Sequence, residues 1–249
     1  MIVTPKRNIV QKIINRTVYR LAMKPFPVAF ESHLEEAGAD PETVFNAVYE
    51  SNYWESEESG SGGGSTIART ETYRPQLAKL LNDLQIHSMF DAPCGDLNWM
   101  PLVLASAKVR YIGGEIAENA LATAHARQPN LDIRHFDICT DEFPDADLWH
   151  CRDTFFHLSF ADIWRALDRA SAANLKYAAI TTHKARMLEN LDIKTGGFRL
   201  LDLERAPFNF PPAIHYLKDY GRKEFPRFVG VWRMDALQGA VANRPKLAV

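Results

Sequence analysis

The chain has 249 residues, of which 46% are hydrophobic and 24% are charged, and its formal net charge is -2. This composition excludes a wholly disordered chain, and the near-neutral charge gives no reason to expect a nucleic-acid partner. The three cysteines, Cys94, Cys139 and Cys151, lack the spacing of a zinc site, so we expect reduced thiols in a cytoplasmic protein.

Residues 1–24 mix basic and polar residues with apolar ones. They therefore contain neither the core of a signal peptide nor a membrane-spanning run, and we expect no transmembrane segment. Basic and apolar residues recur here at helical spacing. We expect this stretch to pack against the domain or against a partner subunit in a homo-oligomer, and binding to a membrane surface is the alternative.

The next segment predicts a short helix followed by a loop. Residues 41–53 have apolar positions three and four apart, with Asp40 as N-cap and Pro41 at the first helical position. Residues 54–66, WESEESGSGGGST, contain three consecutive glycines and predict no packed element. By itself such a stretch is typical of a flexible linker. The alternative is a loop that closes over a ligand, because Gly and Ser let backbone amides approach anions.

From Ile67 onward the pattern alternates between helices and strands, which predicts an α/β fold with a parallel sheet and helices on both faces. Residues 67–84 predict one helix, or a pair broken at Pro75. Strands are expected at residues 88–92, 110–115, 132–137, 147–151 and 177–182, and helices at residues 98–107, 118–127 and 160–172. Two later strands, within residues 205–221 and 228–234, are expected to form an antiparallel hairpin.

The most informative segment is SMFDAPCGDLNWM, in which an apolar strand ends at Asp91 and turns through Gly95 into a helix. Ligands of doubly wound sheets lie outside the carboxyl ends of the strands, so a cofactor is expected at this turn. The dinucleotide pattern GxGxxG is absent, and Asp96 would repel a pyrophosphate. The segment favours a nucleoside without phosphates, such as S-adenosylmethionine, whose sulfonium and amino groups are cationic.

Two further acids end strands in the same way. Glu115 closes the segment RYIGGE, and its carboxylate can accept hydrogen bonds from both ribose hydroxyls. Asp137 closes the next strand, and we expect it to accept the adenine amino group while Ile138 packs on the ring. The alternative is an exposed strand-end acid for Glu115 and a surface turn for Asp137.

The fourth strand leads into WHCRDTFFHLSF, whose polar residues Arg152, Asp153 and His157 are expected where the methyl donor and the acceptor meet. A histidine with a pKa near ~6.5 can take a hydroxyl proton at neutral pH. The alternative is a histidine that satisfies backbone groups at a helix start. Asp153 would orient His157 or act as the base itself, and His183, after the fifth strand, is either a second pocket residue or a loop residue.

Asp153, His157 and His183 are residue types that bind divalent metals. Their spacing in the chain matches no recognisable ligand pattern, so we expect no metal.

Five segments together resemble a family of bacterial class I methyltransferases that is often associated with cell-surface polysaccharide synthesis. They are GSGGGST, FDAPCGDLNWM, YIGGEI, FDICTDEFPDADLWHCRDTFFHLSF and DIKTGGFRLLDLERAPFNFPPAI. The resemblance implies a Rossmann-like, doubly wound, seven-stranded, mostly parallel sheet with an antiparallel last strand. It implies S-adenosylmethionine as methyl donor. The match runs from about Tyr53 to Leu237, and we expect residues 1–66 to form an N-terminal helical extension and lid, and residues 67–249 to form the methyltransferase domain.

The resemblance also assigns roles to single residues. Asp91, Cys94 and Gly95 would border the methionine end of the cofactor, and Arg74 would pair with its carboxylate. The full set expected to bind the cofactor is Trp54, Ser65, Arg74, Asp91, Ala92, Pro93, Cys94, Gly95, Asp96, Trp99, Glu115, Ile116, Asp137, Ile138 and Arg152. Tyr53, Phe156 and His183 are expected to contact the acceptor, and His157 and Asp153 are the expected catalytic residues.

These expectations favour an O-methyltransferase that modifies a hydroxyl of a sugar or surface-glycan intermediate. Two alternatives stay open at this point. One is a methyltransferase that acts on oxygen or nitrogen of a small metabolite or natural product. The other is a non-catalytic nucleoside-binding module.

Overall fold

The structure is a computed structural model that describes residues 40–184, 189–221 and 225–245, so the basic and apolar stretch at residues 1–24 lies outside the described residues. Helix α3 (Pro41–Glu50) starts as expected, because the Asp40 carboxylate accepts a hydrogen bond from the Thr43 backbone N–H at 2.9 Å. It ends before the expected Tyr53, since Asn52 takes a positive φ of 46° that a helix cannot continue.

In the described part of the chain the strands form one seven-stranded sheet in the order β3-β2-β1-β4-β5-β7-β6. The strands are β1 (Ser88–Asp91), β2 (Arg110–Glu115), β3 (Asp132–His135), β4 (Ala146–Cys151), β5 (Leu175–His183), β6 (His215–Lys218) and β7 (Arg227–Arg233). Strand β7, the last in the chain, runs antiparallel to both of its neighbours, and the other pairs are parallel. The predicted Rossmann-like, mostly parallel sheet with an antiparallel last strand is thereby confirmed.

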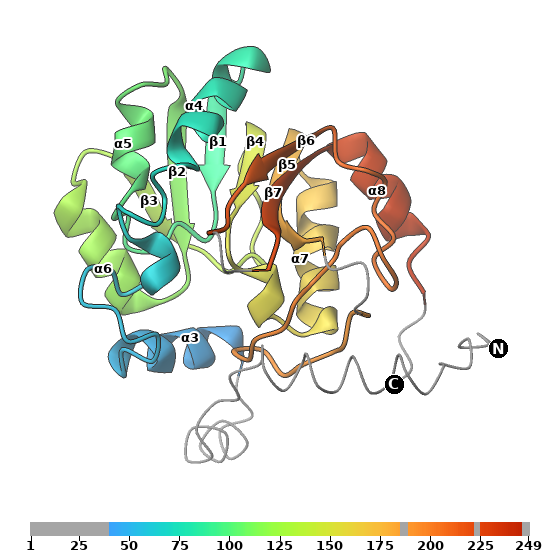
Figure 1. Ribbon diagram of the computed structural model, residues 1–249, viewed down its shortest axis with the longest axis horizontal. Helices are drawn as coiled ribbons and strands as arrows, with labels where there is room; N and C mark the ends of the chain where they lie inside the picture. Colours follow the sequence, from blue (N-terminus) through green and yellow to red (C-terminus); the bar gives the residue numbers. More distant parts are fainter. Residues whose placement is uncertain (1–39, 185–188, 222–224, 246–249) are drawn as a thin grey trace.

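Helices cover both faces of this sheet. Figure 1 shows α4 (Arg74–Asp83), α5 (Met100–Leu104) and α6 (Glu118–Arg127) on one side, and α7 (Phe160–Ala172) and α8 (Met234–Ala242) on the other. Neighbouring strand residues serve opposite faces, since Met89 and Leu148 join the core under α4 and α5, whereas Phe90 and Trp149 join the core under α7 and α8. Because both faces of the sheet are covered, the side chains on both sides of each strand are buried. This explains why the strands appear in the sequence as continuous apolar runs.

Several helix bounds differ from the sequence prediction. The expected helix at residues 67–84 begins only at Arg74, where Pro75 occupies the first turn without loss of a helical hydrogen bond. The expected helix at residues 98–107 shortens to α5, and α8 was not predicted. None of the helices within the described ranges is long and apolar enough to cross a membrane.

The predicted strands also change at their ends. Strand β3 stops at His135, because the Asp137 backbone N–H donates to the Asp141 carboxylate and turns the chain away from the sheet. Of the strand expected within residues 205–221, only β6 forms, and the Pro-rich part before it runs as loop. The predicted antiparallel hairpin of β6 and β7 is confirmed.

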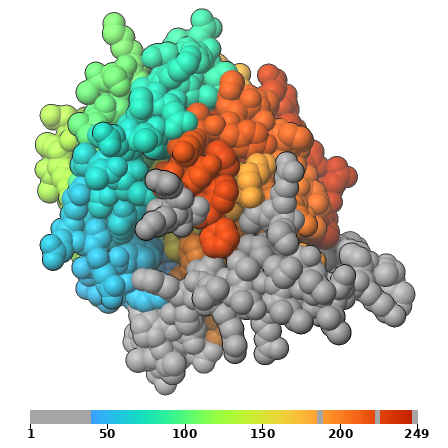
Figure 2. Space-filling view, in the orientation of Figure 1, coloured from blue at the N-terminus to red at the C-terminus, as the bar shows by residue number. Residues whose placement is uncertain are grey.

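Two distant segments meet above the sheet. Figure 2 shows the blue-to-teal atoms of residues 40–83 beside the orange-red atoms of the β6 and β7 region on one face. Gln76 donates to the Lys218 carbonyl at 3.0 Å, and Arg69 donates to the Asp219 carbonyl at 3.0 Å. The chain before α4 is thereby fixed to the C-terminal hairpin, next to the carboxyl ends of the central strands.

Candidate active site

A pocket of about 880 Å³, part of it open to solvent, lies at the carboxyl ends of β1, β2 and β4. The predicted residues that line the pocket are Trp54, Ser65, Asp91, Pro93, Cys94, Gly95, Asp96, Trp99, Glu115, Ile116, Asp137, Ile138, Arg152, Asp153 and His157. The fold therefore brings most of the predicted set to one place.

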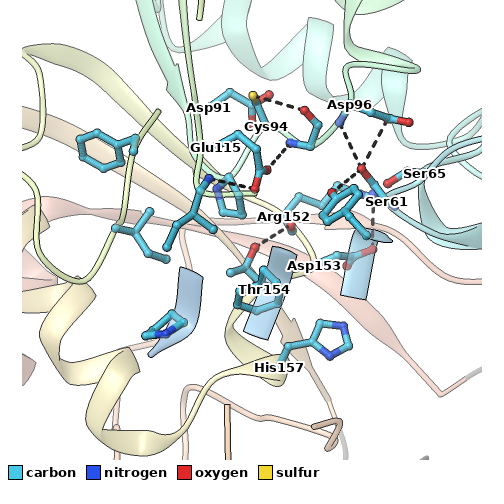
Figure 3. Close-up of a pocket in the computed structure, with 18 of the residues that line it drawn as sticks. Ser61, Ser65, Asp91, Cys94, Asp96, Glu115, Arg152, Asp153, Thr154 and His157 are labelled. Atoms are coloured by element: carbon cyan, nitrogen blue, oxygen red, sulfur yellow. Dashed lines mark hydrogen bonds and ion pairs between the residues drawn. The ribbon is translucent and has the colours of Figure 1, made fainter. Parts of the chain in front are cut away.

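Glu115 ends β2 with its carboxylate buried in the pocket wall (Figure 3). It accepts backbone hydrogen bonds from Gly95 at 2.8 Å and from Ile116 and Ala117 at 2.9 Å each. Burial raises the pKa of Glu115 to about 7, against the three backbone donors that favour its charged form. These donors fix the position of the carboxylate, and its remaining lone pairs can still accept ligand hydroxyls.

One end of the pocket is apolar. Phe45, Phe136 and Ile138 line it and present apolar surface to a ligand. Asp137 also lines this end, but its carboxylate accepts from the Cys139 backbone N–H at 2.8 Å and so caps its own turn. The predicted contact between Asp137 and an adenine amino group stays a prediction.

Farther along the sheet edge, the pocket is lined by the carboxylate of Asp91 and the guanidinium of Arg152. Asp91 ends β1, where its carboxylate bonds the His150 Nδ1 at 2.6 Å and accepts from the Tyr111 hydroxyl at 2.8 Å. Arg152, at the start of the loop after β4, donates to the buried Asp219 carboxylate at 2.9 and 3.1 Å. A carboxylate and a guanidinium at one end of a pocket match the ammonium and carboxylate of an α-amino acid.

The Ser/Gly loop (residues 59–66) is bonded to the first turn. Ser59 Oγ and the Gly60 backbone N–H donate to the Asp96 carboxylate at 2.9 and 3.0 Å, and Arg127 pairs with the same carboxylate at 2.9 Å. Gly95 has a φ of 60°, and a Cβ built there would lie 2.4 Å from Ser61 Oγ. Glycine is thus required at position 95 for two reasons, because the backbone has a positive φ and because the packed loop leaves no room for a Cβ.

The same loop reaches the other side of the pocket. Arg152 donates to the Gly64 carbonyl at 2.9 Å, and the Asn98 side chain donates to the Ser65 carbonyl at 3.0 Å. Ser61 and Ser65 both line the pocket. The loop is therefore bonded to two sides of the pocket, and its closure over a ligand stays a prediction.

His157 is oriented by a backbone carbonyl. Its Nδ1–H donates to the Gly197 carbonyl at 2.7 Å, which leaves Nε2 of the neutral ring as an acceptor. Burial lowers the pKa of His157 to about 4. The rings of Trp54 and Phe198 lie 5.6 and 5.8 Å from the His157 ring. The hypothesis that Asp153 orients His157 is replaced by the Gly197 contact.

Asp153 instead belongs to a charged network. It pairs with Arg152 and Arg227, each at 3.3 Å. Although burial opposes ionisation, the two guanidinium groups hold the pKa of Asp153 below its ordinary value. Asp153 also has a positive φ of 57°, which is uncommon for a residue with a side chain and concentrates at functional sites.

The remaining predicted residues, Tyr53, Arg74, Ala92, Phe156 and His183, are not part of the pocket lining. Arg74 donates to the Ile67 carbonyl at 3.2 Å, and His183 accepts from the Leu201 backbone N–H through Nδ1 at 3.2 Å. His183 lies behind Phe156, with 5.4 Å between the rings, and burial together with Arg227 lowers its pKa to about 4. Contacts of these residues with a ligand stay predictions.

Sequence reasoning missed several residues of the site. His150, Tyr49 and Thr154 line the pocket, and Asp219 holds Arg152 from 67 residues away. His150 could have been recognised from the sequence, because it is a polar residue inside the apolar strand ADLWHC. No feature of the sequence around Asp219 indicated its role. Within the described ranges no group of three His, Cys, Asp or Glu side chains is arranged to hold a metal ion.

No protein-family model and no curated protein matches this sequence. Solved structures do share its fold. Magnesium protoporphyrin IX methyltransferase from Synechocystis PCC 6803, with bound SAM, has a TM-score of 0.54 at 12% identity, over 78% of this chain and 97% of that one. The PH0226 protein from Pyrococcus horikoshii OT3 has a TM-score of 0.53 at 13% identity, over 69% and 93% of the two chains.

The methyltransferase domain of bacterial CtHen1-C has a TM-score of 0.51 at 12% identity, over 66% of this chain and 98% of that one. Likeness at such low identity defines the architecture. The chain has the Rossmann-like fold found in class I methyltransferases.

Proposed function

We propose that the protein is an S-adenosylmethionine-dependent methyltransferase that modifies a hydroxyl of a sugar or surface-glycan intermediate. The observation that carries the proposal is the order of groups along one pocket. Along the edge of the sheet, in the strand order β3-β2-β1-β4, the apolar residues around Ile138 follow β3, Glu115 ends β2, Asp91 ends β1 and Arg152 follows β4. An adenosyl amino acid presents the complementary series, which is an aromatic ring, a ribose diol, and an ammonium with a carboxylate.

The residues present fit this donor in their chemistry. Glu115 would accept the ribose hydroxyls, Asp91 the ammonium, and Arg152 the carboxylate. Asp96, which was expected to contact the cofactor, bonds Ser59 and Gly60 and would act mainly through the Ser/Gly loop. The fold supports the same donor, because one neighbour of equal architecture was solved with SAM bound.

The proposed reaction requires the protein to align two reactants and to accept one proton. When bound, the donor supplies a methyl group on a sulfonium for in-line displacement by the acceptor oxygen. His157 would take the hydroxyl proton on Nε2 while the Gly197 carbonyl holds Nδ1–H. Alignment of acceptor and donor contributes much of the acceleration, and the Ser/Gly loop would keep water out.

The acceptor class rests on the surroundings of His157. Trp54 lines the pocket with its ring centre 5.6 Å from that of His157, and aromatic faces of this kind pack against the apolar faces of sugar rings. An unactivated sugar hydroxyl is a poor nucleophile, so a nearby acceptor of protons suits it. The resemblance to methyltransferases of polysaccharide synthesis points to the same acceptor class.

The test is a methyl-transfer assay with the full chain. S-adenosylhomocysteine is measured after incubation with crude surface-glycan fractions and nucleotide sugars, and separately with a panel of small metabolites containing hydroxyls and amines. We expect turnover with the glycan set. Turnover only with the metabolites would replace the acceptor class, and cofactor binding without any turnover would favour a nucleoside-binding module.

Two further parts of the proposal concern organisation. We propose that residues 1–66 act as extension and lid and that residues 67–249 form the methyltransferase domain. The free thiols of Cys94, Cys139 and Cys151 agree with the reducing cytoplasm as the compartment. A homo-oligomer stays a prediction, which the molar mass in solution would test.

A further inference from the structure

Four buried side chains form one hydrogen-bonded chain beside the pocket. The Tyr73 hydroxyl lies 2.8 Å from His150 Nε2, His150 Nδ1 lies 2.6 Å from Asp91 Oδ1, and the Tyr111 hydroxyl lies 2.8 Å from Asp91 Oδ2. Asp91 and His150 line the pocket, and the two tyrosines lie behind them. Tyr73 immediately precedes α4, so this series of hydrogen-bonded side chains links four separate segments of the protein.

The direction of every proton in this chain follows from the chemistry. Burial raises the pKa of both phenols, so Tyr73 and Tyr111 stay protonated and can donate. An ionised carboxylate only accepts, so His150 donates from Nδ1–H to Asp91. The Nε2 of a neutral His150 then accepts from Tyr73. All donors point toward Asp91, and they fix the rotation of its carboxylate.

This arrangement leaves the negative charge of Asp91 available to the pocket. The guanidinium of Arg152, which also lines the pocket, pairs with Asp219 and Asp153, and lies 5.3 Å from the ring centres of Tyr73 and Trp99. The donors to Asp91 are neutral in the arrangement above. A carboxylate oxygen has more than one lone pair, so Asp91 can accept another hydrogen bond from a cationic ligand.

We propose that His150 is a positioning residue, which holds the Asp91 carboxylate in the orientation that accepts the ammonium group of the cofactor's amino acid. The inference rests on the proposed function. A purely structural role, in which the chain only ties β1 to β4, would affect all ligands of the pocket alike. The two roles are therefore separated by ligands that differ only in the amino-acid part.

The experiment is calorimetric binding of S-adenosylhomocysteine and of 5′-methylthioadenosine to the full chain. Both are neutral thioethers with the same nucleoside, and only the first carries the ammonium and carboxylate. For His150→Leu we expect a loss of about 10- to 100-fold in affinity for S-adenosylhomocysteine and less than about 3-fold for methylthioadenosine. Tyr73→Phe should give a smaller loss, about 3- to 10-fold, for S-adenosylhomocysteine alone.

His150→Asn is the conservative variant, because its amide can donate from the place of Nδ1–H, and it should restore most of the affinity. Ser88→Ala is the matched control, since Ser88 bonds the Asp147 backbone at the other end of β1. It should lower the melting temperature without changing the ratio of the two affinities. Where His150→Leu does not fold, Tyr73→Phe decides by the same ratio.

Equal losses for both ligands, or no loss for either, would overturn the inference while the proposed function stands. Failure of the unmodified protein to bind either ligand would instead overturn the proposed function, and the inference with it. Ligand binding by the unmodified protein therefore distinguishes a failure of the inference from a failure of the proposed function.

Discussion

We divide the pocket into a proposed cofactor half, around Glu115 and Asp91, and a proposed acceptor half, around His157 and Asp153. The acidic side chains of the two halves have different kinds of hydrogen-bond and ion-pair partners. In the cofactor half, Glu115 is surrounded by uncharged backbone donors from Gly95, Ile116 and Ala117. In the acceptor half, Asp153 is paired with the guanidinium groups of Arg152 and Arg227. Backbone donors come from the turns that immediately surround a strand end. Of the two arginines, Arg152 directly precedes Asp153, whereas Arg227 comes from β7 far along the chain. The first half is built locally and the second partly by long-range contacts.

The largest effect is expected in the cofactor half. Glu115→Ala removes the acceptor for the ribose and leaves three backbone N–H groups unsatisfied, each at a cost of about 1–3 kcal/mol. We expect at least about 100-fold weaker binding of S-adenosylhomocysteine by calorimetry. Glu118→Ala, at the exposed start of α6, is the control and should bind normally. Unchanged binding in Glu115→Ala would remove the ribose assignment.

This local construction explains what could be predicted from the sequence. Asp91 and Glu115 each end an apolar strand, and parallel strands bring their carboxyl ends to one edge of the sheet. The fold class, the strand order near these acids and the lining of the cofactor half follow from that rule. Gly95, which was expected to border the methionine end of the cofactor, lies against Ser61 of the Ser/Gly loop, a contact that no local pattern in the sequence predicts.

The acceptor half was only partly predictable, for a physical reason. His157 and Asp153 were recognised, but their partners Gly197 and Arg227 lie in a loop and an antiparallel strand far along the chain. No periodic pattern links such positions, and their contacts depend on how the loop between β5 and β6 folds. The orientation of His157 by a carbonyl therefore required the structure.

A second prediction concerns His157. Its replacement by alanine removes the proposed base while Glu115 and Asp91 are unchanged, so turnover should fall by about 100-fold with nearly intact cofactor affinity. Because its pKa is lowered to about 4, turnover of the unmodified protein should stay level from pH 8 to 5 and fall below that. His125→Ala on exposed α6 serves as the control. Full turnover in His157→Ala would refute the base role.

Glu115, in the pocket wall, and His183, outside the pocket lining, should respond to pH in opposite directions. The pKa of Glu115 is raised to about 7 from 4.5, so the folded state binds more protons and its stability falls as pH rises through this range. The pKa of His183 is lowered to about 4 from 6.5, so the unfolded state binds more protons and stability rises with pH up to 6.5. Between pH 5 and 6.5 the two effects oppose each other.

Urea unfolding at several pH values in this window separates the two contributions. Glu115→Gln should make the slope of stability against pH more positive by up to about 1.4 kcal/mol per pH unit. His183→Asn, which keeps an acceptor for the Leu201 N–H, should make the slope less positive by a similar amount. Slopes that shift in the same direction in both variants would contradict the opposite pKa shifts of Glu115 and His183.

The smallest effect is expected where the Ser/Gly loop joins the halves. Asp96→Asn keeps one oxygen for Ser59, but it turns an amide N–H toward the Gly60 N–H and ends the ion pair with Arg127. The loop would stay attached through Gly64 to Arg152 and loosen only on the cofactor side. We expect the cofactor KM to rise by about 3- to 10-fold with less than about 2-fold change in kcat.

Limited proteolysis within residues 55–66 should become faster in the same variant, because the loop would open more often. Asp83→Asn, which breaks an exposed pair with Lys79, should change neither measurement, since such pairs contribute little. A rise in KM without faster cleavage would mean that Asp96 contacts the cofactor directly, as first expected. Faster cleavage with an unchanged KM would mean that the contact between Arg152 and Gly64 is enough to keep the loop closed over the cofactor.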